Sequence, residues 1–190
     1  DMMWQRGVLD TTQMAGAFQI LRSNDLVWSR LVRHYLMGEQ SAPNDLMSWN
    51  ADATRMPYRM HSKYLRRLFL DNDLFQGRYK VDGRNIALSD IHVPVFLVGT
   101  VMDHVAPWRS VYKFQLVSDA PSVTLLLTSG GHNAGIVSEP RNSRRTYQMM
   151  THREGEKHLD PDQWLEEAPR FSGSWWIPWQ KWLADHSSGQ

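Results

Sequence analysis

An acid and a base each follow an apolar run of the sequence. Asp103 comes shortly after the run at 93–100, and His132 comes shortly after the run at 123–130, 29 positions further along the chain. A carboxylate can hold an imidazole in one tautomer, and the imidazole can then move protons to and from a nucleophile. These residue types at this spacing therefore indicate acid–base support of nucleophilic catalysis.

Both residues also have purely structural interpretations. Asp103 could be a turn acid or a helix cap, and His132 could be a loop histidine bonded to its own backbone. His104 adjoins the acid, so we expect it to orient the structure or line the site rather than act as the base. The spacing alone leaves these alternatives open.

The two apolar runs predict the elements that position these residues. Neither run alternates as a half-exposed strand would, which is typical of strands inside a parallel sheet. Pro107 between them suits a first helical turn, and apolar residues recur beyond it through 111–117. The spacing predicts a β-α-β unit in an α/β fold, where catalytic groups gather at the carboxyl ends of the strands.

The order of acid and base also indicates which group is missing. An Asp after one strand and a His after the next is the order of the last two members of an α/β-hydrolase triad. The chain contains no cysteine, and no G-x-S-x-G, H-E-x-x-H or G-x-x-x-x-G-K motif. We therefore expect the nucleophile to lie in polypeptide before residue 1, and we expect no metal site.

Capping residues, glycines and prolines predict the remaining elements. An amphipathic helix at 24–37 would open at Asn24 and end at Gly38. The other expected elements are a helix at 58–71, a hairpin at 78–88 around Asp82-Gly83, and two short helices capped by Asp160 and by Ser174.

The composition excludes several classes of protein. Of 190 residues, 42% are hydrophobic and 22% charged, which is typical of a soluble globular protein. A formal net charge of +1 provides no general attraction to nucleic acid or anionic membranes. No stretch approaches about 20 apolar residues and the first residues do not form a signal peptide, so we expect neither a transmembrane segment nor secretion.

Several short motifs recur in a specific order along nearly the whole chain. They are Trp49-Asn50-Ala51-Asp52-Ala53-Thr54 with Pro57, Asp103-His104 with Pro107-Trp108, Gly131-His132 with Ala134-Gly135, Gly173-Ser174-Trp175-Trp176 with Trp179, and Trp182-Leu183. Each motif alone is weak, but their joint order resembles the C-terminal part of the polyhydroxyalkanoate synthases, which are polyester-forming acyltransferases.

The resemblance implies a fold and a set of site residues. It implies the C-terminal part of an α/β-hydrolase core at 89–190, preceded at 1–88 by part of a mostly helical cap. Members of the family use a cysteine nucleophile, so the resemblance makes Asp103 the catalytic acid and His132 the base. The residues expected to bind substrate are His104, Trp108 and Asn133.

The resemblance also implies a reaction and partners. The intact protein would transfer an (R)-3-hydroxyacyl group from coenzyme A to its cysteine and then to a growing polyester. No cofactor is expected beyond the coenzyme A of the substrate. A homodimer, a cytoplasmic location at the surface of polyester granules and no nucleic-acid partner are expected. Asn133, where many members have Ile, leaves the chain length of the monomer open.

Other functions also fit these residues. The intact protein could be an intracellular hydrolase or depolymerase with a serine elbow, or the chain could be a non-catalytic subunit that binds granules or a synthase. Without a nucleophile, the isolated chain is expected to be inactive on thioesters and to self-associate through uncovered sheet surface. The tryptophans within 175–182 are expected to pack the last helix on the sheet, with contact to polymer or granule as the alternative.

Overall fold

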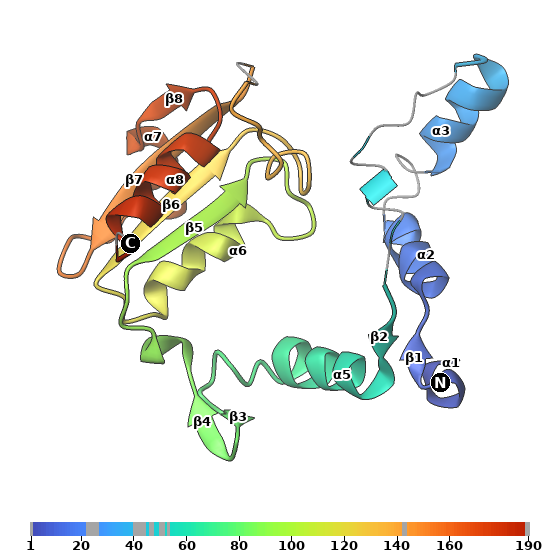
Figure 1. The fold of residues 1–190 in the computed structure, drawn as a ribbon, viewed down its shortest axis with the longest axis horizontal. Coiled ribbons are helices and arrows are strands. Elements are labelled where there is room, and N and C mark those ends of the chain that lie inside the picture. Colours follow the sequence, from blue (N-terminus) through green and yellow to red (C-terminus); the bar gives the residue numbers. More distant parts are fainter. Residues whose placement is uncertain are drawn as a thin grey trace. The chain divides into compact units, whose positions relative to one another are not determined.

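The computed structural model describes residues 2–21, 27–39, 45, 48–49, 52, 54–141 and 144–188. It divides into two compact units, Asp1–Asp73 and Leu74–Gln190, which are described separately. Figure 1 shows the course of the chain through each unit. Helices combined with a sheet that contains a parallel pair of strands place the protein in the α/β class, as the sequence predicted.

The first unit consists of short helices and a small two-stranded sheet. Its strands β1 (Val8–Leu9) and β2 (Met56–Pro57) pair antiparallel. The Trp4 and Tyr58 rings meet edge to face, with centroids 5.7 Å apart, so the first helix packs against the start of the helix after β2. The helices are α1 (Met2–Arg6), α2 (Thr11–Leu21), α3 (Ser29–Leu31) and α5 (Tyr58–Lys63), with π-helical turns at Val32–Leu36 and Tyr64–Leu70.

Two helices of this unit were expected from the sequence. The one predicted at 58–71 is confirmed by α5 and the π-helical turns up to Leu70. The one predicted at 24–37 is helical from residue 27 to Leu36, and its expected cap Asn24 lies outside the described residues. Gly38 follows with a φ of +66°, a left-handed conformation that favours glycine and ends a helix. Among the residues of this unit whose side chains are described, which leave out 17–21, no hydrophobic side chain is buried.

The predicted hairpin is present near the start of the second unit. It consists of β3 (Tyr79–Val81) and β4 (Arg84–Ile86), paired antiparallel. Its two turn residues, Asp82 and Gly83, have φ of +48° and +80°. Positive φ at both positions is what a two-residue type I′ turn requires, which explains the Asp-Gly signal. A 3-10 turn at Leu88–Asp90 follows.

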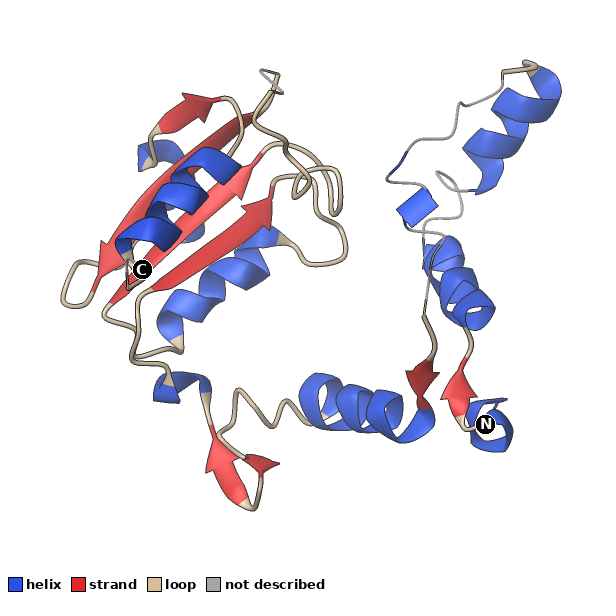
Figure 2. Ribbon diagram, in the orientation of Figure 1, coloured by secondary structure: helices blue, strands red, loops and turns tan. Residues whose placement is uncertain are grey.

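A four-stranded sheet forms the centre of the second unit. Its strands, in spatial order, are β5 (Val95–Thr100), β6 (Ser122–Thr128), β7 (Thr146–Arg153) and β8 (Arg170–Ser172). β5 and β6 are parallel and are joined through α6 (Trp108–Tyr112), which confirms the predicted β-α-β unit. The antiparallel strands β7, which pairs with β6, and β8, which pairs with β7, were not predicted from the sequence (Figure 2).

The two parallel strands differ in their surroundings. β6 lies inside the sheet, and residues 123–128 are all buried, as its continuous apolar run predicts. β5 forms one edge of the sheet, although its sequence has the same apolar character. No strand in the described part of the chain pairs with the outer side of β5, so an apolar strand presents free backbone groups there.

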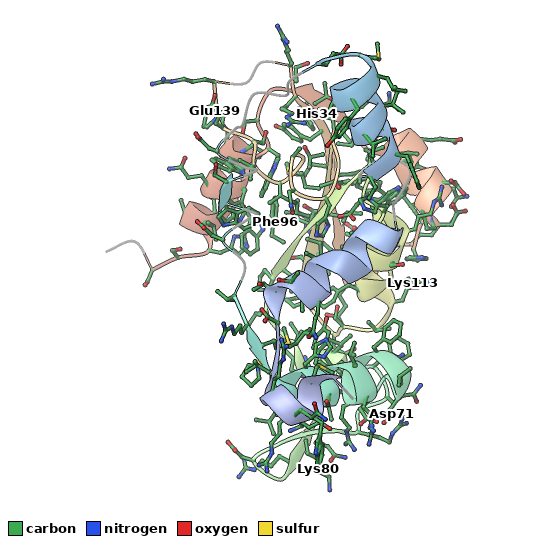
Figure 3. The ribbon with its side chains drawn as sticks, turned by 90° about the vertical axis from the view of Figure 1, so that its right-hand side faces the viewer. His34, Asp71, Lys80, Phe96, Lys113 and Glu139 are labelled. Atoms are coloured by element: carbon green, nitrogen blue, oxygen red, sulfur yellow. The ribbon has the colours of Figure 1, made fainter. Side chains whose placement is uncertain are left out.

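Helices cover both faces of this sheet. On one face, α6 and α7 (Pro161–Glu167) contribute to a hydrophobic core of Trp108, Tyr112, Leu125, Leu127, Trp164 and Ala168. On the other face, Phe96 of β5, which is labelled in Figure 3, contacts Trp182 of α8 (Trp176–Asp185) with ring centroids 5.5 Å apart. Leu97 packs against the core, and neighbouring residues of a strand point to opposite faces, so α8 covers the opposite face from α6.

Both tail helices begin where the sequence predicts. The Asp160 carboxylate accepts hydrogen bonds from the backbone N–H groups of Asp162 and Gln163, and the Gln163 side chain completes a capping box. Ser174 Oγ accepts a hydrogen bond of 3.1 Å from Trp176 N–H at the start of α8. The same hydroxyl donates to the carbonyl of Ser138, so it also joins this helix to the loop before β7.

Candidate active site

The predicted acid and base lie in two adjacent loops at the carboxyl ends of β5 and β6. Backbone hydrogen bonds join these loops just beyond the sheet. Val101 N–H donates to the Thr128 carbonyl at 3.0 Å, and Met102 N–H donates to the Gly130 carbonyl at 3.0 Å. The parallel pairing therefore continues past the strands and brings the two loops together.

A direct hydrogen bond connects the side chains of the two residues. His132 Nδ1 lies 2.8 Å from Asp103 Oδ2. The other carboxylate oxygen, Oδ1, accepts hydrogen bonds of 2.8 Å from the backbone N–H groups of Val105 and Ala106. The carboxylate is thus held by its own loop on one side and meets the imidazole on the other.

These contacts favour the ionised form of Asp103. Burial by itself would raise the pKa of this carboxyl group, since a charge is less stable away from water. The hydrogen bonds from Ala106, from the His132 ring and from Val105 outweigh burial and lower the pKa below its ordinary value. Asp103 is therefore an ionised acceptor near neutral pH, and this places the proton of a neutral imidazole on Nδ1.

The ring of His132 is accessible, whereas its partner is not. The His132 side chain is 43% exposed, and the Asp103 side chain is 8% exposed. With Nδ1 engaged by the carboxylate, Nε2 of a neutral ring keeps its lone pair and has no partner among the described residues. Such a ring can accept a proton from a group that approaches from outside and can later return it.

Close packing holds the loop that carries His132. Gly130 has a φ of +112°, and Gly135 lies so near Thr100 that a Cβ there would be 2.7 Å from Thr100 Cγ2. These two positions explain why the segment around the histidine is rich in glycine. Met102 and Ile136 are exposed on the two loops, as are Val101, Val105 and Val137.

Two tryptophans predicted to pack the last helix also bind this loop. Trp175 Nε1–H donates to the Gly135 carbonyl at 3.1 Å, and Trp176 Nε1–H donates to the Ile136 carbonyl at 2.9 Å. Trp182 packs on the sheet through Phe96. The sequence cluster therefore has two structural functions: part of it packs α8 on the sheet, and part of it holds the segment after His132.

The three residues predicted to bind substrate occupy different environments. His104 is exposed and lies in the acid loop. Asn133 is half-buried beside the histidine, and its carbonyl accepts N–H groups of Ile136 and Val137. Trp108 is buried, and its ring packs against Tyr112 and Trp164 in the core. Substrate binding by these residues stays a prediction.

Arg145 is a site-associated residue that sequence analysis missed. It precedes β7, and its guanidinium contacts the loop that carries His132. No motif in the sequence signals this contact, because it joins segments that meet only through the antiparallel pairing of β7 with β6.

Among the described residues, no group of three His, Cys, Asp or Glu side chains is placed to hold a metal ion. Nor does the described part of the chain contain a helix long and apolar enough to cross a membrane. The full sequence has no cysteine, so a thiol nucleophile has to come from outside this chain.

Comparison with curated proteins finds relatives over nearly the whole chain. It is 40% identical over 177 residues to poly(3-hydroxyalkanoate) polymerase subunit PhaC of Rhizobium meliloti, covering 93% of this chain and 28% of that protein. It is 38% identical over 187 residues to poly(3-hydroxyalkanoate) polymerase of Methylorubrum extorquens, covering 98% of this chain and 30% of that protein.

A further relative is subunit PhaC of Cupriavidus necator, at 35% identity over 179 residues, which is 94% of this chain and 30% of that protein. No model of a known protein family matches the chain. The chain thus spans about 30% of the length of these curated relatives. These matches confirm the resemblance that the motifs indicated.

Proposed function

We propose that this chain, a homologue of part of the poly(3-hydroxyalkanoate) polymerases, carries the general base and the orienting acid of a polyester-forming acyltransferase. The supporting observation is the hydrogen bond of 2.8 Å between Asp103 and His132, with the imidazole accessible on its other side. In this proposal the chain is the C-terminal part of an α/β-hydrolase core preceded by part of a cap.

The first step would form an acyl-enzyme. Nε2 of His132 accepts the thiol proton of a cysteine supplied by another part of the protein, and the sulfur attacks the carbonyl carbon of an (R)-3-hydroxyacyl thioester. The bond between that carbon and the sulfur of coenzyme A breaks, and the leaving thiolate takes the proton from the imidazolium. The ionised Asp103 stabilises the imidazolium through Nδ1–H.

The second step would lengthen the polymer. A hydroxyl group attacks the acyl-cysteine carbonyl carbon while Nε2 of His132 accepts its proton. The new ester bond forms as the bond between that carbon and the cysteine sulfur breaks, and the leaving thiolate takes the proton from the imidazolium. Asp103 would serve this step by orienting His132 or by helping to activate the 3-hydroxyl group of an incoming monomer. The reaction needs no resident cofactor, since coenzyme A enters as part of the substrate.

Water has to be excluded, because a hydrated acyl-enzyme would hydrolyse instead of elongating. The loops around the two side chains expose apolar residues, namely Val101, Met102, Val105, Ile136 and Val137. This apolar surround fits an acyl chain or a covering segment better than open solvent. In this proposal, a cap that includes residues 1–88 keeps water away from the acyl-enzyme. The intact enzyme is proposed to be a homodimer and to act in the cytoplasm at the surface of polyester granules.

The test uses the intact protein with (R)-3-hydroxyacyl-CoA thioesters of several acyl lengths. Release of coenzyme A together with insoluble polyester supports the proposal. Release of free hydroxy acid without polymer would instead favour the hydrolase alternative, and a lack of any turnover would favour a non-catalytic subunit. Mass spectrometry of the quenched enzyme checks the intermediate, because an acyl group should be found on a cysteine rather than a serine.

A further inference from the structure

Arg145 holds both ends of the segment that carries His132. Its Nη2 donates to the Ala134 carbonyl at 2.5 Å, and its Nη1 donates to the Ser129 carbonyl at 3.4 Å. These carbonyls lie two residues after and three residues before the histidine. A single guanidinium therefore spans the base of the loop from which the imidazole projects.

The loop is shaped to receive this group. A Cβ on Gly130 would lie 2.7 Å from Arg145 Nη1 and 2.9 Å from Gly135 Cα, so a side chain at this position would displace the guanidinium and meet the backbone of the same loop. Gly130 also adopts a φ of +112°, which L side chains rarely do. The positive φ and the close approach of the Gly135 backbone both favour glycine here, and the absence of a side chain leaves space for the guanidinium beside the predicted base.

The backbone at Arg145 is anchored to the sheet. Its carbonyl accepts a hydrogen bond of 2.6 Å from Gly173 N–H, which follows β8. Thr146 N–H, the next in the chain, donates to Ser129 Oγ at 3.1 Å, while the Thr146 carbonyl accepts Ser129 N–H at 2.8 Å. The guanidinium thus extends into the loop from a fixed position at the start of β7.

The charged guanidinium of Arg145 donates to backbone carbonyls rather than to a carboxylate. In the described part of the chain no carboxylate forms an ion pair with it. Its Nε is buried without a hydrogen-bond partner. Its hydrogen bonds go to loop carbonyls, and bonds from a charged donor are stronger than those between neutral groups. Burying part of a guanidinium is costly, and these two carbonyl contacts are what offsets that cost.

We propose that Arg145 is a positioning residue that holds the loop 129–134 in the conformation that aligns His132 with Asp103. The inference rests on the proposed function for its catalytic consequence, but its structural part concerns the hydrogen bond between His132 and Asp103 alone. Arginine suits this task because its planar fork can donate to two carbonyls at once, whereas a lysine ammonium is a compact point charge.

The first experiment measures that hydrogen bond directly in the intact protein. With ¹⁵N-labelled histidine, the Nδ1–H proton bonded to Asp103 gives a strongly downfield resonance that is assigned by its loss in His132→Gln. Arg145→Met should shift this resonance upfield or broaden it by exchange, while the indole resonances of the core tryptophans stay in place. Arg170→Met is the matched control, since the Arg170 side chain is exposed on β8, and it should leave the resonance unchanged.

The second experiment measures turnover. Arg145→Met should lower kcat about tenfold to a hundredfold with little change in KM, the effect expected of a misaligned catalytic group. Arg145→Lys should recover only part of the loss, and added guanidinium ion should restore part of the activity of Arg145→Ala. A wild-type kcat in Arg145→Met would overturn the catalytic consequence of the proposal.

Two outcomes separate this inference from the proposed function. An unchanged resonance in Arg145→Met refutes the positioning role, whatever activity the protein has. A wild-type protein without acyl transfer refutes the proposed function, while the resonance still decides the role of Arg145. If Arg145→Met does not fold, Arg145→Lys decides in its place, and a wild-type resonance in that variant rejects the need for a forked donor.

Discussion

The carboxylate of Asp103 contacts the His132 ring through one oxygen and its own loop through the other. Oδ2 lies 2.8 Å from His132 Nδ1, and Oδ1 accepts two backbone N–H groups at 2.8 Å. The two interpretations left open by the sequence, a turn acid and a partner of the histidine, are therefore both present in the same side chain. The turn contacts fix the carboxylate in the position from which it can orient the imidazole.

Replacing the acid without changing its size separates these contributions. Asp103→Asn should lower kcat of the intact enzyme by about three to four orders of magnitude, because an amide cannot hold the same tautomer or stabilise the imidazolium. Asp162→Asn is the control, since Asp162 pairs with Arg109 on the exposed surface. Steady-state release of coenzyme A measures both variants, and equal activity in them would remove Asp103 from the mechanism.

The lowered pKa of Asp103 predicts how its contribution to stability depends on pH. A carboxyl group whose native pKa lies below its unfolded value stabilises the native state at every pH above the unfolded value, 3.8 for this group. That contribution declines as pH falls through the lowered native pKa. We expect the difference in the free energy of unfolding between wild type and Asp103→Asn, measured with urea from neutral pH to about pH 3, to decrease only at the acid end of this range. A difference that stays constant over this pH range would contradict the hydrogen bonds described for Asp103.

Removing the base should stop catalysis and leave the fold. His132→Ala should lower turnover by at least about a thousandfold, because no other group takes the proton of the nucleophile. Its side chain is 43% exposed, so little packing is lost and the midpoint of thermal unfolding should change little. His186→Ala, at the exposed end of α8, is the matched control. Turnover near that of wild type would assign the base elsewhere.

Two glycines in the same loop should respond differently to a methyl group. In Gly135→Ala the new Cβ would lie 2.7 Å from Thr100 Cγ2 and 2.8 Å from the Gly131 carbonyl, so we expect a loss of about 1–3 kcal/mol in the free energy of unfolding. In Gly131→Ala the nearest atom, the Met102 carbonyl oxygen, is 3.9 Å away. Chemical denaturation of both variants is the measurement. Similar stability in the two would refute the packing described for this loop.

The buried strand β6 should dominate the stability of the second unit. Leu125 is fully buried, and Leu125→Ala should cost about 3 kcal/mol through lost burial and an unfilled cavity. Leu116→Ala is the control because that side chain is 59% exposed, and its effect should stay within about 0.5 kcal/mol. Equal losses in the two variants would mean that the sheet is not the core that the structure indicates.

Local signals in the sequence predicted most elements of the second unit. Asp82-Gly83 predicted a hairpin because both turn residues need positive φ, and Asp160 predicted a helix start because its carboxylate can satisfy free N–H groups. Strand β7 was missed because its sequence, Thr146 to Arg153, lacks a clear apolar alternation. Its buried Gln148 is accommodated by hydrogen bonds to the carbonyls of Leu165 and Ala168, which no pattern along the chain announces.

The sequence by itself determined the chemistry available at the site, because the identity of Asp103 and His132 and their place after two apolar strands follow from residue order alone. Because β5 and β6 pair in parallel, their carboxyl ends are adjacent, and the proximity of Asp103 and His132 could be predicted. Only the tertiary structure decided how the two side chains are held. The contacts from Arg145, Trp175 and Trp176 come from segments brought to the loop by β7, β8 and α8, and contacts between distant segments leave no periodic trace in a sequence.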